Sequence, residues 1–509
     1  MPTYRSSYTR RRRSVRILGA AVIAVAGLTT FRQTPRAQTA DWVPPYPLLL
    51  TPDRALAVAQ AAADRLDYIP GEVVVRFKPG AVPADQQRAL MSLRSRPSVA
   101  RLRWSGRVAV LRDESEPDAR VLAATLARQP EVAFAEPNYL YRISSEPTDP
   151  GYASRQWNMK AIDMPRAWDI NPGARDTITV AVLDSGITTV NENFVVPTWN
   201  GSAIQNFTAR FATNPDLSSA RLVSPVDFAF WGGPVIDTVG HGTHVSGTIG
   251  QDSNNDLGEA GMAYRTRIMP VKVCFGFWEV QWSLSSSGFG GYAPLNSGAC
   301  PDEAIAAGIT YAADNGAKVI NLSLGGPAPA QAVLDAMKYA VGKGAFIAIA
   351  AGNSHEQGNP PEYPAAYAAD IEGAMSVAAV GPSLTRAFYS NTTSRVEIAA
   401  PGGNDREGSS AVAKIWQMSL LETDSDEATV ILPRFDRYTD VAAQGTSMAA
   451  PHVAGLAALL LSQGVSKPAA IEALIKATAR DIGTKGRDDE TGYGLIQPRA
   501  ALRGFGVMR

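Results

Sequence analysis

The sequence is poor in the residues that most often bind metals or form covalent frameworks. Its 509 residues include only two cysteines, Cys274 and Cys300, and four histidines. Two cysteines are too few for a disulfide framework or for a zinc site built from thiolates. In an exported protein the two could form one bridge, and the alternative is a pair of buried thiols. His241 and His244 are three residues apart, but no glutamate accompanies them as in the helix of a zinc protease, so we expect no metal there.

The sequence also lacks an excess of charge of either sign. Lysine and arginine together number 48, as do aspartate and glutamate. This balance does not favour nucleic acid or an anionic membrane as a partner. Hydrophobic residues make up 45% of the chain and there are 44 glycines, which is typical of a globular protein with a large core and many tight turns. The length predicts two to four domains, and we find no internal repeats.

The first residues have the pattern of an export signal. A basic segment at residues 10–13 precedes the uncharged, mostly apolar residues 17–31, which are too few to span a bilayer comfortably. We therefore expect a signal peptide over residues 1–40, with cleavage after Ala37 or Ala40, and a secreted protein without membrane contact after its removal. The alternative is an uncleaved signal anchor.

Residues 68–144 are predicted to form a small α+β unit. Apolar residues repeat with a period of 2 in the predicted strands and 3.6 in the predicted helices, in the order strand, helix, strand, strand, helix and strand. Asp118 is placed to begin the second helix. This order is that of a ferredoxin-like module, and the segment has no residues that suggest chemistry of its own. The turn-forming residues 146–152 then read as a linker.

The chain beyond the linker is predicted to be α/β. Apolar β-branched runs at residues 178–183, 319–322 and 346–350 alternate with helical stretches at residues 300–315 and 330–342. Continuous apolar strands between helices indicate a parallel sheet covered on both faces. Residues 223–238, 275–299 and 402–441 lack clear periodicity, so we expect surface insertions there.

Three segments place a reactive side chain where an α/β fold exposes it. Asp184 ends a buried strand and is followed by Ser-Gly, so it points towards the ligand-binding edge of the sheet. His241 begins a glycine-rich helix, and Ser447 lies in the first turn of an apolar helix, where the amides favour developing negative charge. Each residue alone has a plainer explanation, as a turn cap, a core histidine or a helix cap. We assign that plainer role to His244 and His452.

Together these segments resemble the subtilisin-like serine protease family. The strings Asp-Ser-Gly, His-Gly-Thr-His-Val-Ser-Gly and Gly-Thr-Ser-Met-Ala-Ala-Pro-His-Val-Ala-Gly match in the family's chain order. The resemblance implies a three-layer subtilisin-like fold and a serine endopeptidase in which Ser447 is the nucleophile, His241 the base and Asp184 its orienting partner. It also implies that Asn353, at the end of the 346–350 strand, donates to the oxyanion.

The resemblance also suggests residues that bind the substrate. Ser323, Leu324, Gly325 and Gly326 correspond to the segment that lines the cleft, where an extended peptide pairs with the backbone. The alternative is an ordinary core strand and turn. Glu362 would lie near the base of the first specificity pocket and would favour lysine or arginine before the cut.

Catalysis of this kind needs no cofactor, but a structural calcium ion is implied. The loop carrying Ser253, Asn255, Leu257 and Glu259 resembles the calcium loop of the family, and Gln156 matches a distant ligand. Asn193 stands where the family often has aspartate, which removes one charge from the set.

The ferredoxin-like unit resembles the propeptides that assist folding and block the cleft of such enzymes. We therefore expect residues 41–147 to be the propeptide of an autoprocessed zymogen and residues 148–509 the catalytic domain, with cleavage between residues 142 and 149. The resemblance covers residues 68–502, and the segment at residues 492–496 fits the closing part of the family, so we expect no further domain. Expected partners are protein or peptide substrates and the propeptide itself, and the enzyme is expected to be a monomer.

Three other functions remain possible on these residues. A non-catalytic relative could bind peptides in the cleft, although such relatives usually have a replaced triad residue. A regulatory inhibitor could act through the first domain, although an intact triad would then have no use. An esterase or transferase could use the same triad, because acyl-enzyme chemistry does not specify the acceptor.

Overall fold

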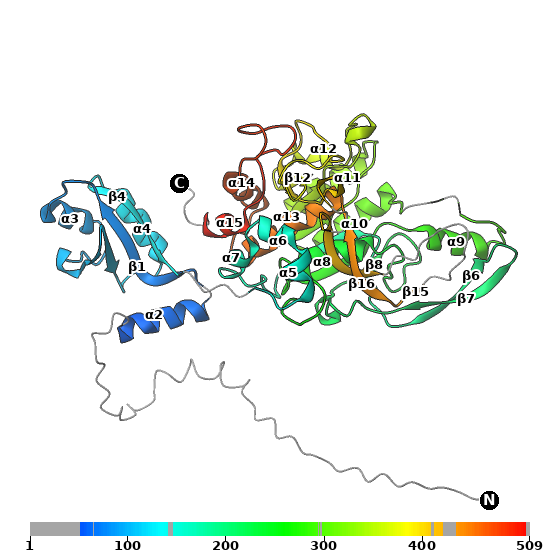
Figure 1. The fold of residues 1–509 in the computed structure, drawn as a ribbon, viewed down its shortest axis with the longest axis horizontal. Helices are drawn as coiled ribbons and strands as arrows, with labels where there is room; N and C mark the ends of the chain where they lie inside the picture. The colour runs from blue at the N-terminus through cyan, green and yellow to red at the C-terminus, as the bar shows by residue number, and fades with distance from the viewer. Residues whose placement is uncertain are drawn as a thin grey trace, which may run out of the picture. The chain divides into compact units, whose positions relative to one another are not determined.

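The computed structural model describes residues 51–64, 66–140, 146–293, 295, 298–408, 412–420 and 434–504 (Figure 1). The predicted signal peptide lies outside these ranges, as do residues 141–145 of the expected processing region. Within the described ranges, no helix is both long and apolar enough to cross a bilayer.

The first described region contains the predicted ferredoxin-like unit. Its elements follow the predicted order, and a helix that we did not predict, α2 (Pro52–Ala63), precedes them. The elements are β1 (Tyr68–Phe77), α3 (Pro83–Leu90), β2 (Arg103–Ser105), β3 (Val108–Arg112), α4 (Ala119–Ala127) and β4 (Val132–Tyr139). The four strands pair antiparallel in the order β2-β3-β1-β4, which confirms the ferredoxin-like arrangement.

This unit has its own hydrophobic core. Val73 and Val75 on β1 are fully buried with Leu122 and Leu126 on α4, as the strand and helix periods require. The Asp118 side chain accepts a hydrogen bond of 3.0 Å from the backbone amide of Arg120 and so caps α4 as predicted.

The second region is built on a seven-stranded sheet in which every neighbouring pair is parallel. Its order is β13-β12-β11-β10-β5-β9-β8. The strands are β5 (Thr179–Asp184), β8 (Val226–Asp227), β9 (Arg267–Lys272), β10 (Val319–Leu322), β11 (Phe346–Ala350), β12 (Ala374–Val380) and β13 (Ile398–Pro401). The three runs predicted as buried strands are β5, β10 and β11, and nearly all their residues are buried.

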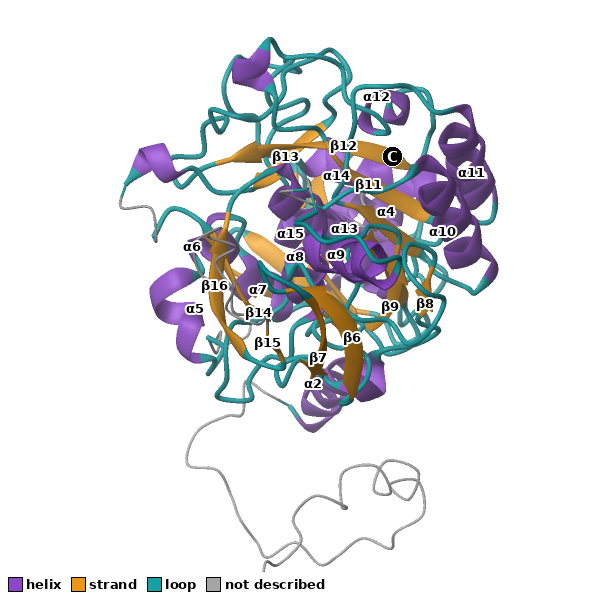
Figure 2. Cartoon of the chain, turned by 90° about the vertical axis from the view of Figure 1, so that its right-hand side faces the viewer, coloured by secondary structure: helices purple, strands orange, loops and turns teal. Residues whose placement is uncertain are grey.

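Helices cover both faces of this sheet, which gives the three layers predicted from the sequence (Figure 2). On one face α8 (His241–Gly250) and α13 (Thr446–Ser462) share a core with α14 (Pro468–Thr478) and α15 (Pro498–Gly504). On the other face α10 (Asp302–Asp314) and α11 (Gln331–Gly342) pack on a second core. Four short helices also contribute buried residues to these cores. They are α5 (Pro150–Arg155), α6 (Trp157–Ala161) and α7 (Met164–Trp168) in the first core and α12 (Ala365–Ala368) in the second.

Segments that lack sequence periodicity nevertheless contain regular structure. The hairpin of β6 (Asn193–Trp199) and β7 (Ile204–Phe211) pairs with β15 (Arg434–Phe435), and β14 (Ile415–Leu420) pairs with β16 (Tyr438–Ala443). Helix α9 (Phe277–Ser286) lies in the expected insertion at residues 275–299. Trp282 of α9 packs edge-on against Phe211 and Phe435, so this insertion has a small aromatic core of its own.

Candidate active site

A carboxylate and an imidazole meet at the carboxyl edge of the parallel sheet. Asp184 is the last residue of β5, and its buried side chain accepts the backbone amide of Ser185 at 2.7 Å. The same oxygen, Oδ1, lies 2.7 Å from Nδ1 of His241, the first residue of α8. The strand end and the helix start thus bring together two residues that are 57 positions apart in sequence.

The surroundings of His241 act on its pKa in opposite directions. Burial lowers the pKa, while the charge of Asp184, the hydrogen bond to it and the charge of Asp237 raise it. The net shift is upward, because the paired carboxylate stabilises the imidazolium form. The His241 side chain remains 34% exposed, so the ring that Asp184 orients still faces solvent.

Asp237, which sequence reasoning did not select, organises the start of α8. Its fully buried carboxylate accepts the amides of Val239 and Gly240 at 3.0 and 2.9 Å and the hydroxyl of Thr243 at 2.6 Å. It also accepts the hydroxyl of Ser185 at 3.0 Å, so one side chain connects the residue after Asp184 to the helix that carries His241. The usual capping signal is a polar residue directly before the helix, and that position is Gly240, so the local sequence did not indicate Asp237.

The nucleophile candidate lies in the first turn of α13. Ser447 is partly exposed, and its hydroxyl donates to the backbone carbonyl of Ser323 at 3.2 Å. Within the described residues Ser447 and His241 form no hydrogen bond. Such contacts are often long or misaligned in a serine protease without substrate.

Pro451 inside α13 has a structural consequence for this serine. Proline has no amide hydrogen, so Pro451 cannot donate to the carbonyl of Ser447 one turn earlier. The hydroxyl of Ser323 donates to that carbonyl at 2.8 Å, and the side chain of Asn321 donates to the same hydroxyl at 2.9 Å. Because of the proline, the carbonyl of Ser447 is free to accept the hydroxyl of Ser323, and this hydrogen bond connects α13 to the end of β10.

Asn353 follows β11 and has a fixed side-chain orientation. Its Oδ1 accepts the backbone amide of Thr446 at 2.9 Å and the Thr446 hydroxyl at 3.0 Å. The hydroxyl also accepts the amide of Gly352 at 3.1 Å, which binds the strand end to the start of α13. With the oxygen occupied, the amide nitrogen of the exposed Asn353 is the free donor.

The segment Ser323–Gly326 leaves β10 and runs beside these residues. Gly326 pairs with Tyr363 through two backbone bonds of 2.9 and 2.8 Å. Leu324 and Gly325 make no backbone hydrogen bond to any described residue, so their donors and acceptors are available for an extended chain. Glu362 lies next to this pairing, and its Oε1 accepts the Ser354 hydroxyl at 2.6 Å.

Two other histidines are core residues, as predicted. His244 Nε2 lies 3.2 Å from the carbonyls of Ile415 and Val441, and burial lowers the pKa of His244 to about 4. His452 contacts the carbonyl of Met448 and the side chain of Asn158, and burial lowers its pKa to about 4 as well. Both rings are therefore neutral at physiological pH and hold α8 and α13 in place.

Cys274 and Cys300 form a disulfide, which decides between the two alternatives that the sequence left open. The bond closes the insertion that contains α9 at its base. The backbones of the adjacent Phe275 and Ala299 pair with each other at 2.9 Å in both directions.

The residues predicted as calcium ligands do not come together with oxygen atoms that are free to bind an ion. The Gln156 amide is fully used by the backbone of Ala260, with bonds of 2.8 and 2.9 Å. Asn193 is exposed on β6, where it pairs with Arg210. Glu259 is buried 3.2 Å from Arg155, and burial raises the pKa of Glu259 to about 8, with Asp440 adding to the rise and Arg155 opposing it.

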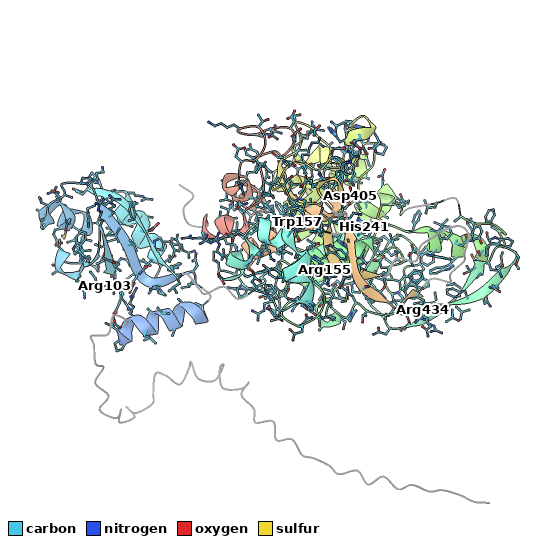
Figure 3. All side chains as sticks on the ribbon, in the orientation of Figure 1. Arg103, Arg155, Trp157, His241, Asp405 and Arg434 are labelled. Atoms are coloured by element: carbon cyan, nitrogen blue, oxygen red, sulfur yellow. A yellow bond between two sulfur atoms is a disulfide. The ribbon has the colours of Figure 1, made fainter. Side chains whose placement is uncertain are left out.

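Within the loop itself, the other predicted ligands are engaged locally. The Ser253 hydroxyl accepts the amide of Gly261 at 3.1 Å, and Asn255 Oδ1 accepts the amide of Leu257 at 3.2 Å. Figure 3 labels Arg155 at the end of α5 and Trp157 at the start of α6.

Two carboxylates that sequence reasoning did not select bind the same loop. Asp149 accepts the amide of Asn254 at 2.9 Å, and Asp216 accepts the side chains of Gln251 and Asn255 at 2.6 Å each. Both aspartates are buried, and no basic side chain in the described ranges pairs with either. Burial raises the pKa of Asp149, and it raises that of Asp216 to about 7. In the described ranges no three or more histidine, cysteine, aspartate or glutamate side chains form a metal-binding group.

The comparisons with known proteins agree with this geometry. The model of the subtilase family matches residues 175–494, and that of the fervidolysin N-terminal prodomain matches residues 55–138. The thermophilic serine proteinase of Bacillus sp. (strain AK1) is 31% identical over 398 residues, which are 78% of this chain and 79% of that protein. Thermitase of Thermoactinomyces vulgaris is 34% identical over 341 residues, 67% of this chain and 94% of thermitase.

A solved protease structure from Pseudoalteromonas arctica superposes with a TM-score of 0.52 at 26% identity, covering 70% of this chain and 99% of the other. Further relatives are named extracellular proteases. The chain therefore belongs to the subtilase family and is an extracellular serine endopeptidase made with a propeptide.

Proposed function

We propose that Asp184, His241 and Ser447 are the catalytic triad of this endopeptidase. The observation that carries the proposal is the 2.7 Å contact between Asp184 and the ring of His241, at the carboxyl edge of the sheet, with Ser447 in the first turn of α13. Ser447 attacks the scissile carbonyl while His241 Nε2 takes the hydroxyl proton. Asp184 holds the Nδ1 proton and stabilises the imidazolium, which then protonates the leaving amine. A water molecule then attacks the acyl-enzyme through the same proton transfers, which releases the acyl product and restores Ser447.

Asn353 is proposed as the oxyanion donor. Thr446 occupies the amide oxygen of Asn353, and this leaves the nitrogen to bind the oxygen on which charge develops. The backbone amide of Ser447, at the positive end of the α13 dipole, is the second donor. Preorganised donors of this kind stabilise the transition state more than the ground state.

Ser323, Leu324, Gly325 and Gly326 are proposed to bind the substrate by strand addition. The backbone groups of Leu324 and Gly325 that lack a backbone partner are complementary to an extended peptide. Main-chain recognition gives affinity without requiring one side-chain sequence, which suits an endopeptidase that acts on protein substrates.

Residues 41–147 are proposed as an intramolecular inhibitor that the catalytic domain, residues 148–509, removes by its own activity after export. The match of residues 55–138 to a subtilase prodomain supports this assignment. Cleavage is expected between residues 142 and 149.

The test is to express the wild-type precursor and the Ser447→Ala variant in parallel and to measure their intact masses. We expect only the wild type to lose its N-terminal region near residues 142–149 and to hydrolyse casein. If both mature alike, another protease removes the propeptide. If neither is cut and the wild type leaves casein intact, the catalytic proposal is wrong.

We also propose that the loop at residues 253–259 holds a structural calcium ion with Asp149 and Asp216 as its acidic ligands. Two buried carboxylates with no basic partner favour a cation between them, and calcium prefers oxygen ligands from carboxylates, amides and backbone carbonyls. The ion would offset the burial of these charges and take no part in catalysis. Calcium should raise the melting temperature of the Ser447→Ala precursor, and the variant that also carries Asp216→Asn should not respond. An equal response of both variants would exclude this site.

A further inference from the structure

Two polar side chains of strand β10 face α13, the helix of the proposed nucleophile. Side chains alternate between the two faces of a strand, so Asn321 and Ser323 lie on the same face as Val319. Val319 packs in the core that contains α13, whereas Ile320 and Leu322 belong to the core on the other face of the sheet. Asn321 is fully buried and Ser323 is only 4% exposed. Both side chains are therefore enclosed on the side of the sheet that α13 covers.

These two side chains form a relay of hydrogen bonds that ends on the nucleophile residue. The amide nitrogen of Asn321 donates to the Ser323 hydroxyl at 2.9 Å, and that hydroxyl donates to the backbone carbonyl of Ser447 at 2.8 Å. The Ser447 carbonyl needs this donor, because Pro451 has no amide hydrogen to supply from the next turn of the helix. The Asn321 nitrogen can only donate, so it directs the proton of the Ser323 hydroxyl towards Ser447.

Asn321 carries a cost in stability that packing alone does not explain. Its side-chain oxygen, Oδ1, is buried and accepts no hydrogen bond from any described residue. An unpaired buried acceptor destabilises a fold, and an apolar side chain like those of its neighbours in β10 would avoid this penalty. Departures of this kind from a well-satisfied core are typical of functional sites.

We infer that Asn321 and Ser323 are positioning residues for Ser447. The inference rests on the proposed function, in which Ser447 supplies both the attacking hydroxyl and one oxyanion amide. The relay fixes the backbone just after Ser447, and the bond from the Thr446 amide to Asn353 fixes it just before. Both reactive groups are attached to the Cα atom between these two contacts, so the contacts together set their directions.

The nucleophile hydroxyl is held at the same place. It donates to the backbone carbonyl of Ser323 at 3.2 Å, so Ser323 contacts Ser447 at two points. Loss of the relay leaves the Ser447 carbonyl without a donor and lets the first turn of α13 shift. A displacement of about 1 Å at a reacting group can lower the rate about 100-fold, so we expect the relay to act on kcat.

The experiment compares the processed wild-type enzyme with Ser323→Ala and Asn321→Leu. Ser323→Ala removes the hydroxyl but keeps the backbone groups proposed to bind the substrate. A fluorophosphonate label counts the active sites, and the rate of labelling reports the nucleophile without a peptide. kcat and KM are measured on the succinyl-Ala-Ala-Pro-X p-nitroanilide, with X as Phe, Leu or Lys, that the wild type cleaves fastest.

The far end of α13 offers a matched control. There the side-chain nitrogen of Asn171 donates to the Ser462 hydroxyl at 2.6 Å, and that hydroxyl donates to the carbonyl of Leu459 at 2.8 Å. Ser462 and Asn171 are also buried. Ser462→Ala therefore removes an equivalent relay from the same helix at a distance from the nucleophile.

We expect Ser323→Ala to lower kcat and the labelling rate by the same factor, about 10- to 100-fold, with KM changed less than about twofold. Asn321→Leu should cause a smaller loss of the same kind, and Ser462→Ala should leave kcat per active site unchanged. Pro451→Ala provides a rescue, because it returns an amide donor to the Ser447 carbonyl. In that background the further loss from Ser323→Ala should be less than about threefold.

An unchanged kcat per active site in Ser323→Ala would overturn the inference and leave the proposed function intact. An equal loss in the presence and absence of Pro451, or a rise in KM with unchanged kcat, would overturn it in the same way. If the label does not react with the wild type, or if Ser447→Ala cleaves the peptide equally well, the proposed function fails and this inference fails with it.

Discussion

A buried ion pair next to Asp184 offers the sharpest test of how the insertion around α9 supports the carboxyl edge of the sheet. Lys272, the last residue of β9, lies beside Asp184 in the sheet, and its ammonium is 2.9 Å from Glu279 of α9. Both side chains are fully buried, and Lys272 also donates to the backbone carbonyl of Ser185. The pair therefore joins the insertion to the turn that follows Asp184.

Replacing Lys272 with methionine would leave Glu279 buried without a counter-charge. Breaking a buried pair in this way costs about 3–5 kcal/mol, and in a domain of this size that lowers the melting temperature by about 10 °C. Removing both charges, as in Lys272→Met with Glu279→Leu, should recover most of that loss because neither charge then requires solvation. Burial already raises the pKa of Glu279, although the charge and hydrogen bond of Lys272 oppose it, so the lone carboxyl of the single variant should take up a proton on folding.

The assay is thermal unfolding at a fixed heating rate in the Ser447→Ala background, which prevents self-digestion. Lys343→Met is the matched control, because Lys343 pairs with Asp314 at 3.2 Å with side chains 49% and 45% exposed. Such a surface pair contributes about 1 kcal/mol or less. The reasoning is refuted if Lys272→Met is no more destabilising than Lys343→Met, or if the double variant is less stable than Lys272→Met.

Further predictions concern the triad, the oxyanion donor and the metal. Because only neutral His241 can accept a proton and its pKa is raised by the Asp184 carboxylate, kcat/KM should fall as pH decreases through a pKa higher than that of an ordinary histidine. Asp184→Asn should lower kcat/KM by about 10⁴-fold, as in other serine proteases, and shift the acid limb of the residual activity to lower pH. Asn353→Ala should reduce kcat by about 10²- to 10³-fold with little change in KM, which is the loss known for the corresponding donor in a subtilase. A change in KM as large as the fall in kcat would count against an oxyanion role. Thr446→Val should produce a smaller loss in kcat, because Asn353 keeps its amide but loses one anchor. Chelation with EGTA should remove the stabilisation by bound calcium, about 3 kcal/mol when calcium is at 100 times its dissociation constant, and so lower the melting temperature of the Ser447→Ala precursor. An unchanged melting temperature would speak against bound calcium.

Sequence reasoning was most successful where local pattern and burial agree. The buried strands β5, β10 and β11 are continuous apolar runs, and the helices α10 and α11 show a 3.6-residue period, so each was predicted close to its observed bounds. The ferredoxin-like order followed from the same periodicities. The residues proposed as catalytic were selected because the three short strings around them are specific in residue type and in chain order.

It was less successful where structure depends on contacts between distant segments. Helix α9 and the pair β14–β16 were expected as irregular insertions, since their apolar residues follow no single period. Trp282 is buried by Phe211 and Phe435, which are 71 and 153 residues away and are not visible in any local window. The calcium prediction shows the same limit, because Asp149 and Asp216 reach the loop from segments that the local motif does not include.

The sequence by itself determined the reaction class of this protein, because a serine, a histidine and an aspartate in specific local contexts are recognisable without knowing how they meet. The tertiary structure alone decided how those groups are held. Asp237 caps the helix of His241. The Ser323 hydroxyl donates to the Ser447 carbonyl, which Pro451 cannot reach with an amide hydrogen, and Thr446 orients the side-chain amide of Asn353. These contacts join separate strands and helices, and hydrogen-bond geometry over such separations is set by packing of the whole sheet rather than by any local run of residues.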